Sequence, residues 1–352
     1  MAIKFAINGF GRIGRQTLRA LLEKKASGEI SNDEIEIVAV NDLADVKTLS
    51  HLLKYDSVYG AINDEIIIRE RGSHKSFVGE ITVGDITFGV LSEPDPAKLP
   101  WKQLGVDVVI ESTGHFTDQK SAQAHIRGGA KKVIISAPVK DEVTNTYIVG
   151  VNSDKISAKD NIISNASCTT NCIAPVMDVL DRNFGIEKSL MTTVHAYTAD
   201  QSLVDGPHRD LRRARAAAIN ITPTTTGAAI AATKTLPQLK GRFDGLALRV
   251  PVPVGSIADI VAVTRSEVTI TQINEIFIKE CENPKWKGII TCTTEPLVSS
   301  DIVGDSHSAI IDLSLTQVVK GNLVKIIAWY DNEWGYSNRL IELIIQLGAH
   351  LK

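Results

Sequence analysis

The chain has 352 residues, of which 43% are apolar and 22% are charged, with four cysteines and a formal net charge of -3. This length predicts about two globular domains, and no apolar run approaches the roughly 18 residues that a membrane span needs. The weak net charge favours neither nucleic acid nor a membrane as a partner, and the sparse cysteines together with the absence of a secretory signal indicate a cytoplasmic protein rather than a disulfide scaffold.

The first half of the sequence alternates strand-like and helical patterns. We expect strands at 3–8, 34–42, 106–113 and 132–138, and helices at 12–24, 41–56 and 121–130. Strand–helix–strand order predicts an α/β domain with a parallel sheet covered on both faces. Between residues 61 and 101, short alternating runs broken by Gly and Pro predict small antiparallel strands.

The second half has longer strand-like stretches and fewer helices. Strands are expected within 189–197, 246–265 and 308–331, and helices at 172–184 and 226–239. This pattern predicts an α+β domain with a mainly antiparallel sheet. The final stretch, 337–352, is so apolar that a helix formed by it must be largely covered.

A glycine-rich stretch, NGFGRIGR (8–15), follows the first predicted strand and opens the first predicted helix. Its Gly9, Gly11 and Gly14 have the G-x-G-x-x-G spacing of dinucleotide-binding loops, in which the backbone approaches a pyrophosphate at a helix N-terminus. The second strand ends at Asp42, whose carboxylate would bind the adenosine ribose hydroxyls and repel a 2′-phosphate, favouring NAD over NADP. The alternative is a glycine turn that binds nothing.

Two of the four cysteines lie in the stretch NASCTTNC (165–172). Cys168 precedes a predicted helix, where unpaired N–H groups lower the pKa of a thiol, and His195 ends a strand-like run in the same half. Cys172 lies one helical turn later among apolar residues and is expected to fill the core. A zinc site needs about four ligands in closed spacing, and Cys281 and Cys292 are isolated in the sequence, so we predict no metal.

A thiolate next to a dinucleotide predicts aldehyde oxidation through a thioester, and several residues suggest phosphate binding. The stretch ITPTTTGAA (221–229) places threonines and a glycine at a predicted helix N-terminus, and DLRRARAAA (210–218) supplies three arginines. Arg249 lies within an apolar strand, where its charge needs an anionic partner. Each arginine of the loop at 210–218 is equally compatible with a solvated position.

These motifs together resemble the phosphorylating glyceraldehyde-3-phosphate dehydrogenase family. Further blocks that carry the resemblance are NDLAD (41–45), ESTG (111–114), HAYT (195–198), LRVPVP (248–253) and WYDNEWGYSNR (329–339). The resemblance implies a Rossmann-type NAD-binding domain, formed by 1–167 with the returning C-terminal helix at 331–352, and a catalytic domain at 168–330. It also implies a homotetramer that converts glyceraldehyde 3-phosphate and inorganic phosphate with NAD.

The resemblance also implies roles for individual residues. Cys168 would be the nucleophile and His195 its base, with Ser167 and Thr169 lining the substrate. The remaining implied contacts are Thr198 and Arg249 for the substrate's C3 phosphate; Arg215, Thr226 and Gly227 for inorganic phosphate; Gly9, Gly11, Arg12, Ile13 and Gly14 for the pyrophosphate side of NAD; Asp42 for its adenosine ribose; and Ser136 and Asn332 for its nicotinamide side.

Two alternatives stay open at this point. The first is the related erythrose-4-phosphate dehydrogenase, which hydrolyses its thioester; the PTTTG stretch and Asp42 favour the phosphorylating enzyme. The second is a binding protein of the same fold without turnover. A binding protein has no need for Cys168, His195 and Asn332 together, which favours an enzyme.

Overall fold

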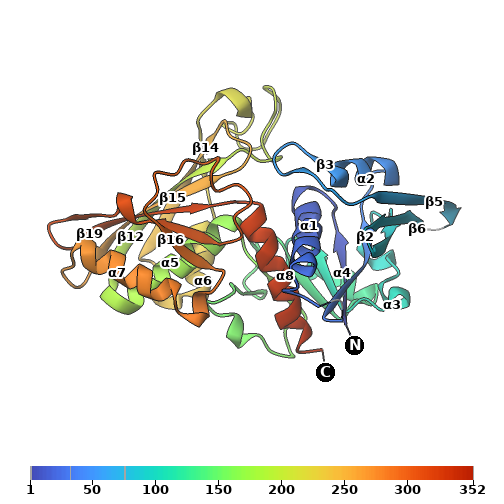
Figure 1. Cartoon of the computed structure of the whole chain (residues 1–352), viewed down its shortest axis with the longest axis horizontal. Helices are drawn as coiled ribbons and strands as arrows, with labels where there is room; N and C mark the ends of the chain where they lie inside the picture. Colours follow the sequence, from blue (N-terminus) through green and yellow to red (C-terminus); the bar gives the residue numbers. More distant parts are fainter. Residues whose placement is uncertain (1, 32, 75–76, 352) are drawn as a thin grey trace. The chain divides into compact units, whose positions relative to one another are not determined.

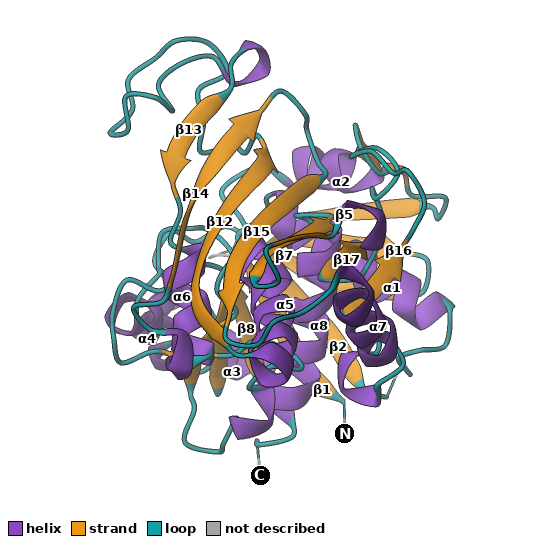
Figure 2. Cartoon of the chain, turned by 90° about the vertical axis from the view of Figure 1, so that its left-hand side faces the viewer, coloured by secondary structure: helices purple, strands orange, loops and turns teal. Residues whose placement is uncertain are grey.

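We describe a computed structural model of the chain, which covers residues 2–31, 33–74 and 77–351 (Figure 1; Figure 2 shows the element types). The chain forms two compact units, Met1–Tyr147, Lys155–Ala166 and Ser337–Lys352 in unit 1, and Ile148–Asp154 and Ser167–Tyr336 in unit 2. Ser167 and the segments 148–154 and 331–336, assigned to the NAD-binding domain from the sequence, fall in unit 2. Of the predicted small strands between 61 and 101, residues 75–76 lie outside the described residues.

The described part of unit 1 contains a sheet of nine strands in the order β10-β11-β9-β8-β1-β2-β7-β6-β5. Pairing is parallel from β10 to β7 and antiparallel between β7, β6 and β5, which confirms the predicted parallel core with antiparallel strands after it. The strands are β1 Ile3–Asn8, β2 Ile35–Asn41, β5 Ile66–His74, β6 Phe77–Val83, β7 Ile86–Leu91, β8 Val108–Glu111, β9 Lys132–Ile135, β10 Asn145–Thr146 and β11 Ile162–Ser164, with a separate pair β3 Tyr55–Asp56 and β4 Gly60–Ala61.

Helices follow the parallel strands of unit 1. Asp45 and Asp118 cap two of them, each accepting a backbone N–H three residues along, as expected for short acidic caps. In the C-terminal helix most apolar residues are buried, and Gly348 packs closely on the Ile3 side chain at the start of β1. The helices are α1 Arg12–Ala26, α2 Val46–Lys54, α3 Trp101–Leu104, α4 Gln119–Arg127 and α8 Trp334–Gly348, with a 3-10 turn at Pro96–Lys98.

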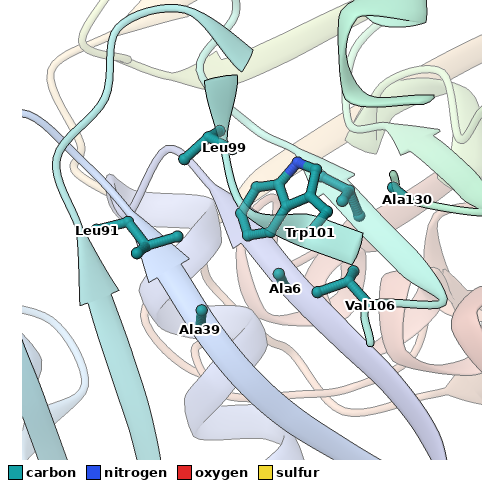
Figure 3. Packing of buried hydrophobic residues seen from close by; sticks show 8 residues of the cluster. Ala6, Ala39, Leu91, Leu99, Trp101, Val106 and Ala130 are labelled. Atoms are coloured by element: carbon teal, nitrogen blue, oxygen red, sulfur yellow. The ribbon is translucent and has the colours of Figure 1, made fainter. Parts of the chain in front are cut away.

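A buried tryptophan organises part of the unit 1 core (Figure 3). Trp101 packs against small side chains of the parallel strands, Ala6 and Ala39, which leave room for its indole ring. Its ring N–H donates to Nδ1 of the buried His125 at 3.1 Å, so the one polar atom of the indole is paired. The tight packing holds α3 and α4 in place on the sheet.

The described part of unit 2 contains an eight-stranded mixed sheet, ordered β13-β14-β12-β15-β19-β17-β16 with β18 paired to β19 (Figure 2). Most pairs are antiparallel, as predicted, whereas β12–β14 and β16–β17 are parallel. The strands are β12 Ile186–Ala196, β13 Thr222–Thr225, β14 Phe243–Val250, β15 Ser256–Thr264, β16 Ile290–Thr293, β17 Ala309–Asp312, β18 Gln317–Val319 and β19 Leu323–Tyr330.

The two longest strand-like stretches of the sequence are interrupted in the structure. The stretch 246–265 forms β14 and β15, because the chain turns between them and Gly255 adopts a φ of 94° that disfavours other residues. The stretch 308–331 forms β17, a 3-10 turn at Leu313–Leu315, β18 and β19. Apolar composition alone does not mark these turns.

The helices of unit 2 are α5 Cys168–Phe184, α6 Ala228–Thr235 and α7 Ile270–Cys281, with 3-10 turns at Ser153–Lys155, Ala217–Ile219, Pro237–Leu239 and Pro284–Trp286. The sequence reading missed α7, although Thr269 and Gln272 form a capping box that signals its start. None of the helices formed by the described residues is both long and apolar enough to cross a membrane.

Candidate active site

The predicted nucleophile, Cys168, is the first residue of α5 rather than a loop residue before it. The helix starts earlier than predicted because the Ser167 hydroxyl accepts the backbone N–H of Thr170 at 3.1 Å and caps the first turn. The thiol is partly exposed yet mostly surrounded by protein, and this burial raises its pKa. Arg249, the Thr169 side chain and nearby backbone N–H groups act in the opposite direction and favour the thiolate.

The structure brings Cys168 and His195 together. Cys168 Sγ lies 3.3 Å from Nε2 of His195, which is buried at the end of β12. Burial, followed by the charge of Arg249, lowers the pKa of His195 to about 3, so the imidazole is neutral at neutral pH. Its Nδ1 lies 2.7 Å from the Ala196 carbonyl oxygen and 2.5 Å from Nη1 of Arg249. Of the two tautomers, the one that carries its proton on Nδ1 and donates it to that oxygen leaves Nε2 free to accept a proton from the thiol.

Arg249 lies beside this pair because of strand register. Parallel pairing of β12 with β14 places Arg249 directly opposite His195, and its Nη1 donates to the Ala196 carbonyl oxygen at 3.0 Å. Its Nε is buried and has no hydrogen-bond partner among the described residues. A guanidinium with an unpaired buried N–H next to a partly exposed thiol is suited to bind an anionic group.

A tyrosine that the sequence reading did not single out completes the surroundings of the thiol. The Tyr330 hydroxyl bonds to Oγ1 of Thr169 at 2.9 Å and to Oγ1 of Thr193 at 2.8 Å. Its ring also packs edge-on against the His195 imidazole, with ring centroids 6.0 Å apart. The signal was present in the block WYDNEWGYSNR, but only the pairing of β15 with β12 and β19 connects Tyr330 to β12.

The threonine–glycine stretch lies close to the first turn of α5. The Thr170 hydroxyl donates to the Ala228 carbonyl oxygen at 3.4 Å, which joins the N-terminal turns of α5 and α6. Gly227 is the N-cap of α6, and a Cβ built on it would contact nothing within 4 Å. The Thr226 hydroxyl accepts the backbone N–H of Ala228. Open space at Gly227, a helix N-terminus and the Thr226 hydroxyl therefore lie close to the first turn of α5, which begins at Cys168.

The structure separates the three arginines of the basic loop. Arg215 is exposed and pairs with the exposed Asp205 at 2.9 Å. Arg213 instead donates to Thr224 Oγ1 at 2.9 Å and pairs with Asp200. The pKa of His195 is lowered mainly by burial and by the charge of Arg249, and the charge of Arg213 contributes further. Arg213 is therefore the arginine of this loop that acts electrostatically on the His195 imidazole. The sequence alone does not show that Arg213, rather than Arg215, is the arginine that acts on His195.

Two further predicted residues of unit 2 have defined positions. Asn332 is buried and lies just beyond the end of β19, after Asp331, and its Oδ1 accepts the Gly255 N–H at 3.1 Å and the Ser256 hydroxyl at 2.9 Å. These bonds orient the carboxamide and leave its NH₂ group as a donor. Thr198 follows β12, with its backbone N–H donating to the Gln201 side chain.

In unit 1 the glycine loop fits a dinucleotide. Gly9 has a φ of 92°, and a Cβ there would lie 2.6 Å from the Thr113 backbone nitrogen. A Cβ on Gly14 would lie 2.4 Å from the Gly9 carbonyl oxygen, whereas Gly11, the N-cap of α1, faces open space. Two glycines therefore permit close packing and the third leaves the helix N-terminus accessible, as a pyrophosphate requires.

The other predicted cofactor residues surround this loop. Asp42 accepts the Phe10 N–H at 2.8 Å and the Ala44 N–H at 3.1 Å, which ties the end of β2 to the glycine loop. Arg12 and Ile13 are the first two residues of α1, so their backbone N–H groups lie at the helix N-terminus, and the Arg12 guanidinium is ion-paired with Asp56. The Ser136 hydroxyl donates to the Glu111 carbonyl oxygen, holding the end of β9 beside β8.

Of the other three cysteines, one lies as the sequence predicts and two do not. Cys172 is fully buried, as expected for a core residue. Cys281 and Cys292, which look isolated in the sequence, lie next to each other in unit 2. Among the described residues no group of three or more His, Cys, Asp or Glu side chains is arranged to hold a metal ion.

Both halves of the chain match known family models. Residues 3–119 match the NAD binding domain of glyceraldehyde 3-phosphate dehydrogenase, and residues 167–332 match its C-terminal domain. The fold and the site thus define an NAD-dependent oxidoreductase with a Rossmann-type domain and a catalytic domain.

Full-length relatives make the assignment specific. The chain is 56% identical to glyceraldehyde-3-phosphate dehydrogenase of Streptomyces coelicolor over 352 residues, and 52% identical to that of Mycolicibacterium smegmatis over 352 residues, with 100% of each chain covered. A protein of the same name from Mycobacterium tuberculosis is 51% identical over 351 residues. The chain belongs to the glyceraldehyde-3-phosphate dehydrogenase family.

Proposed function

We propose that this chain oxidises and phosphorylates D-glyceraldehyde 3-phosphate to 1,3-bisphosphoglycerate, with NAD and inorganic phosphate as co-substrates. The observation that carries the proposal is the 3.3 Å contact between the Cys168 thiol and the neutral His195 imidazole, next to the unpaired Nε of Arg249. A nucleophile, its base and an anion site for a phosphorylated aldehyde are thus adjacent.

In the proposed reaction, His195 Nε2 accepts the thiol proton as Cys168 Sγ bonds to the aldehyde carbon, and it then gives this proton to the former carbonyl oxygen, so that a hemithioacetal forms. NAD, when bound, supplies the hydride acceptor. His195 takes the hydroxyl proton as the hydride leaves, and a thioester on Cys168 results. An oxygen of inorganic phosphate then attacks the thioester carbon, the C–S bond breaks, and the acyl phosphate departs while Cys168 regains its thiolate. The backbone N–H of Cys168 and the His195 side chain would stabilise the oxyanion.

We place the C3 phosphate of the substrate next to the Cys168–His195 pair. Arg249 and Thr198 would bind the C3 phosphate, because the buried Nε of Arg249 otherwise lacks a partner. A bound dianion would also counter the positive charge that lowers the pKa of His195, since Arg249 is the second cause of that shift after burial. Substrate binding therefore makes His195 a better base. Ser167 and Thr169 would line the aldehyde on either side of Cys168.

Inorganic phosphate would bind at the start of α6. Gly227 offers open space and a helix N-terminus, and Thr226 offers a hydroxyl, next to the first turn of α5. Arg215 would supply charge once it releases the exposed Asp205, a pair that is worth little because both partners are solvated.

NAD would bind unit 1 through the glycine loop. Gly9, Gly11 and Gly14 would admit the pyrophosphate beside the backbone of Arg12 and Ile13, and Asp42 would bind the adenosine ribose. Ser136 and Asn332 would contact the nicotinamide side. In Asn332 both acceptor bonds of Oδ1 are already made, so its NH₂ group is the one available to a carboxamide oxygen.

We also propose that the chain assembles into a homotetramer and is located in the cytoplasm. Each chain would have an NAD-binding domain at 1–167 with 331–352 and a catalytic domain at 168–330. An exposed apolar surface of unit 2 supports self-association: Leu190 of β12, Ile230 of α6 and Leu323 of β19 are exposed around a hollow of about 940 Å³. Light scattering coupled to size-exclusion chromatography measures the assembly, and a monomer at micromolar concentration would contradict this proposal.

The reaction is tested by following NADH with glyceraldehyde 3-phosphate, with and without phosphate. Without phosphate we expect a burst of about one NADH per active site, then a stall that phosphate or arsenate relieves. Thr226→Ala and Arg215→Ala should raise the KM for phosphate and leave the burst intact. Steady NADH production at the same rate in phosphate-free buffer would instead identify a hydrolytic enzyme.

A further inference from the structure

Two cysteines of unit 2 that play no part in the proposed reaction face each other. Cys281 is the last residue of α7 and Cys292 lies within β16, and their sulfur atoms are 2.9 Å apart. Both side chains are partly exposed. Since a disulfide bond is about 2.05 Å long, these sulfurs need only a small movement to become bonded.

The structure holds both cysteines in place through the short connection between α7 and β16. The chain turns through the 3-10 segment Pro284–Trp286, which the Asn283 side chain caps by accepting the Lys285 N–H at 3.0 Å. Trp286 is fully buried, and its ring N–H donates to Glu280 Oε2 at 2.7 Å. Because Glu280 precedes Cys281, this bond anchors the end of α7 against the segment that leads into β16.

The two thiols are chemically unequal. A hydrogen bond from the Cys292 thiol lowers the pKa of Cys281, against the opposing effects of burial and the neighbouring Glu280 and Glu282. The same hydrogen bond raises the pKa of Cys292. Cys281 is therefore the better nucleophile and Cys292 the proton donor beside it.

We propose that Cys281 and Cys292 form a redox-active dithiol, a modification site separate from Cys168, which hydroperoxides oxidise reversibly to an intramolecular disulfide. The Cys281 thiolate attacks a peroxide oxygen, the O–O bond breaks, and a sulfenic acid forms as the alcohol or water leaves. Cys292 sulfur then attacks the Cys281 sulfur and releases water. Two thiols and one hydroperoxide thus give one disulfide, one water and one alcohol or water. The proposal does not depend on the reaction assigned to Cys168.

The disulfide would close the loop that contains Trp286. Cross-linking restricts the unfolded chain, so the oxidised protein should melt a few degrees higher than the reduced protein. A thiolate trapped next to a proton donor also reacts before a fully buried thiol does, so Cys172 should stay reduced under the same treatment.

The test uses the full-length Cys168→Ser protein, in which the proposed nucleophile cannot consume oxidant. It is treated with hydrogen peroxide, alkylated and digested for mass spectrometry. We expect a peptide pair joined through Cys281 and Cys292, lost on treatment with dithiothreitol, and a higher melting temperature that the added Cys281→Ser/Cys292→Ser changes abolish. Cys172→Ser in the same background is the matched control and should behave as its parent.

Trapping of sulfenic acid with dimedone tests the order of the two sulfurs. In the Cys168→Ser background, Cys292→Ser should give strong labelling at Cys281, and Cys281→Ser should give weaker labelling at Cys292; equal labelling contradicts Cys281 as the attacking sulfur. The proposal as a whole is overturned if both thiols of the parent remain alkylatable after peroxide. It is also overturned if they reach sulfinic acid without a joined peptide. Both of these overturning outcomes are measured on the Cys168→Ser parent, so neither requires a serine variant of Cys281 or Cys292 to fold.

Discussion

The glycine loop of unit 1 and the thiol site of unit 2 are built in opposite ways. In unit 1, backbone geometry makes the site: Gly9, Gly11 and Gly14 shape one turn, and Asp42 follows the neighbouring strand β2. In unit 2, side chains make the site, and they come from α5, β12, β14 and β19.

This difference changes what a substitution does in each region. A backbone site tolerates loss of one side-chain contact but not a Cβ added where the backbone is closely packed, as at Gly9 and Gly14. A side-chain site depends instead on individual atoms within hydrogen-bond reach. We therefore expect the largest losses of activity from single changes in unit 2 and more graded effects from Asp42.

Cys168→Ser should lower kcat by on the order of 1,000-fold or more, because a hydroxyl does not form the thioester. NAD binding, measured by calorimetry, should be nearly unchanged, since the glycine loop is untouched. Cys172→Ser is the matched control on the same helix and should retain much of the activity. Equal loss in both variants would contradict the assignment of a single nucleophile.

His195→Asn should lower kcat by roughly 100- to 10,000-fold through loss of the general base. The burst of NADH in the absence of phosphate should slow by a similar factor, because His195 acts before and during oxidation. Rapid-mixing absorbance measures this burst. A normal burst with slow steady turnover would show that His195 acts only in acyl release.

Arg249→Leu should lower kcat/KM for glyceraldehyde 3-phosphate by about 10- to 100-fold, as expected for a lost charge-assisted hydrogen bond. Glyceraldehyde without its phosphate provides the internal comparison, and its kcat/KM should change much less. Similar losses for both substrates would show that Arg249 acts on the Cys168–His195 pair rather than on the C3 phosphate.

Asp42→Ala should lower the ratio of kcat/KM with NAD to kcat/KM with NADP by about tenfold. A repulsion between two charges at close range, screened by solvent, has about this size. Asp42→Asn removes the charge but keeps an acceptor for the Phe10 N–H, so it separates repulsion from the shape of the loop. If only Asp42→Ala changes the ratio of kcat/KM values, the loop geometry rather than the charge selects the cofactor.

The last prediction concerns the stability of the fold and its dependence on pH, not activity at neutral pH. The pKa of His195 is lowered from 6.5 to about 3 in the folded chain, so the unfolded chain binds one more proton between these values. The stabilising contribution of the neutral imidazole is therefore complete above about pH 6.5 and is lost as the pH falls toward 3. Chemical denaturation at several pH values should show a steeper loss for the parent than for His195→Asn.

Much of unit 1 was predictable because its signals are local. The parallel strands, the glycine loop and the acidic residue after β2 all follow from short stretches of sequence, and the family models match the same region. The predicted pairing of Cys168 with His195 also agrees with the observed geometry. The turns within 246–265 and 308–331 were missed because apolar composition continues through them.

The fold class, the family and the residue types that the chemistry needs follow from the sequence alone, because motifs a few residues long carry them. Which side chains lie within contact distance of one another depends on how the chain folds. The register of β12 against β14 places Arg249 opposite His195, and a shift by one residue would turn them to opposite faces of the sheet. Likewise, only the turn between α7 and β16 brings Cys281 to Cys292, since neither sequence spacing nor composition encodes the distance between two sulfur atoms.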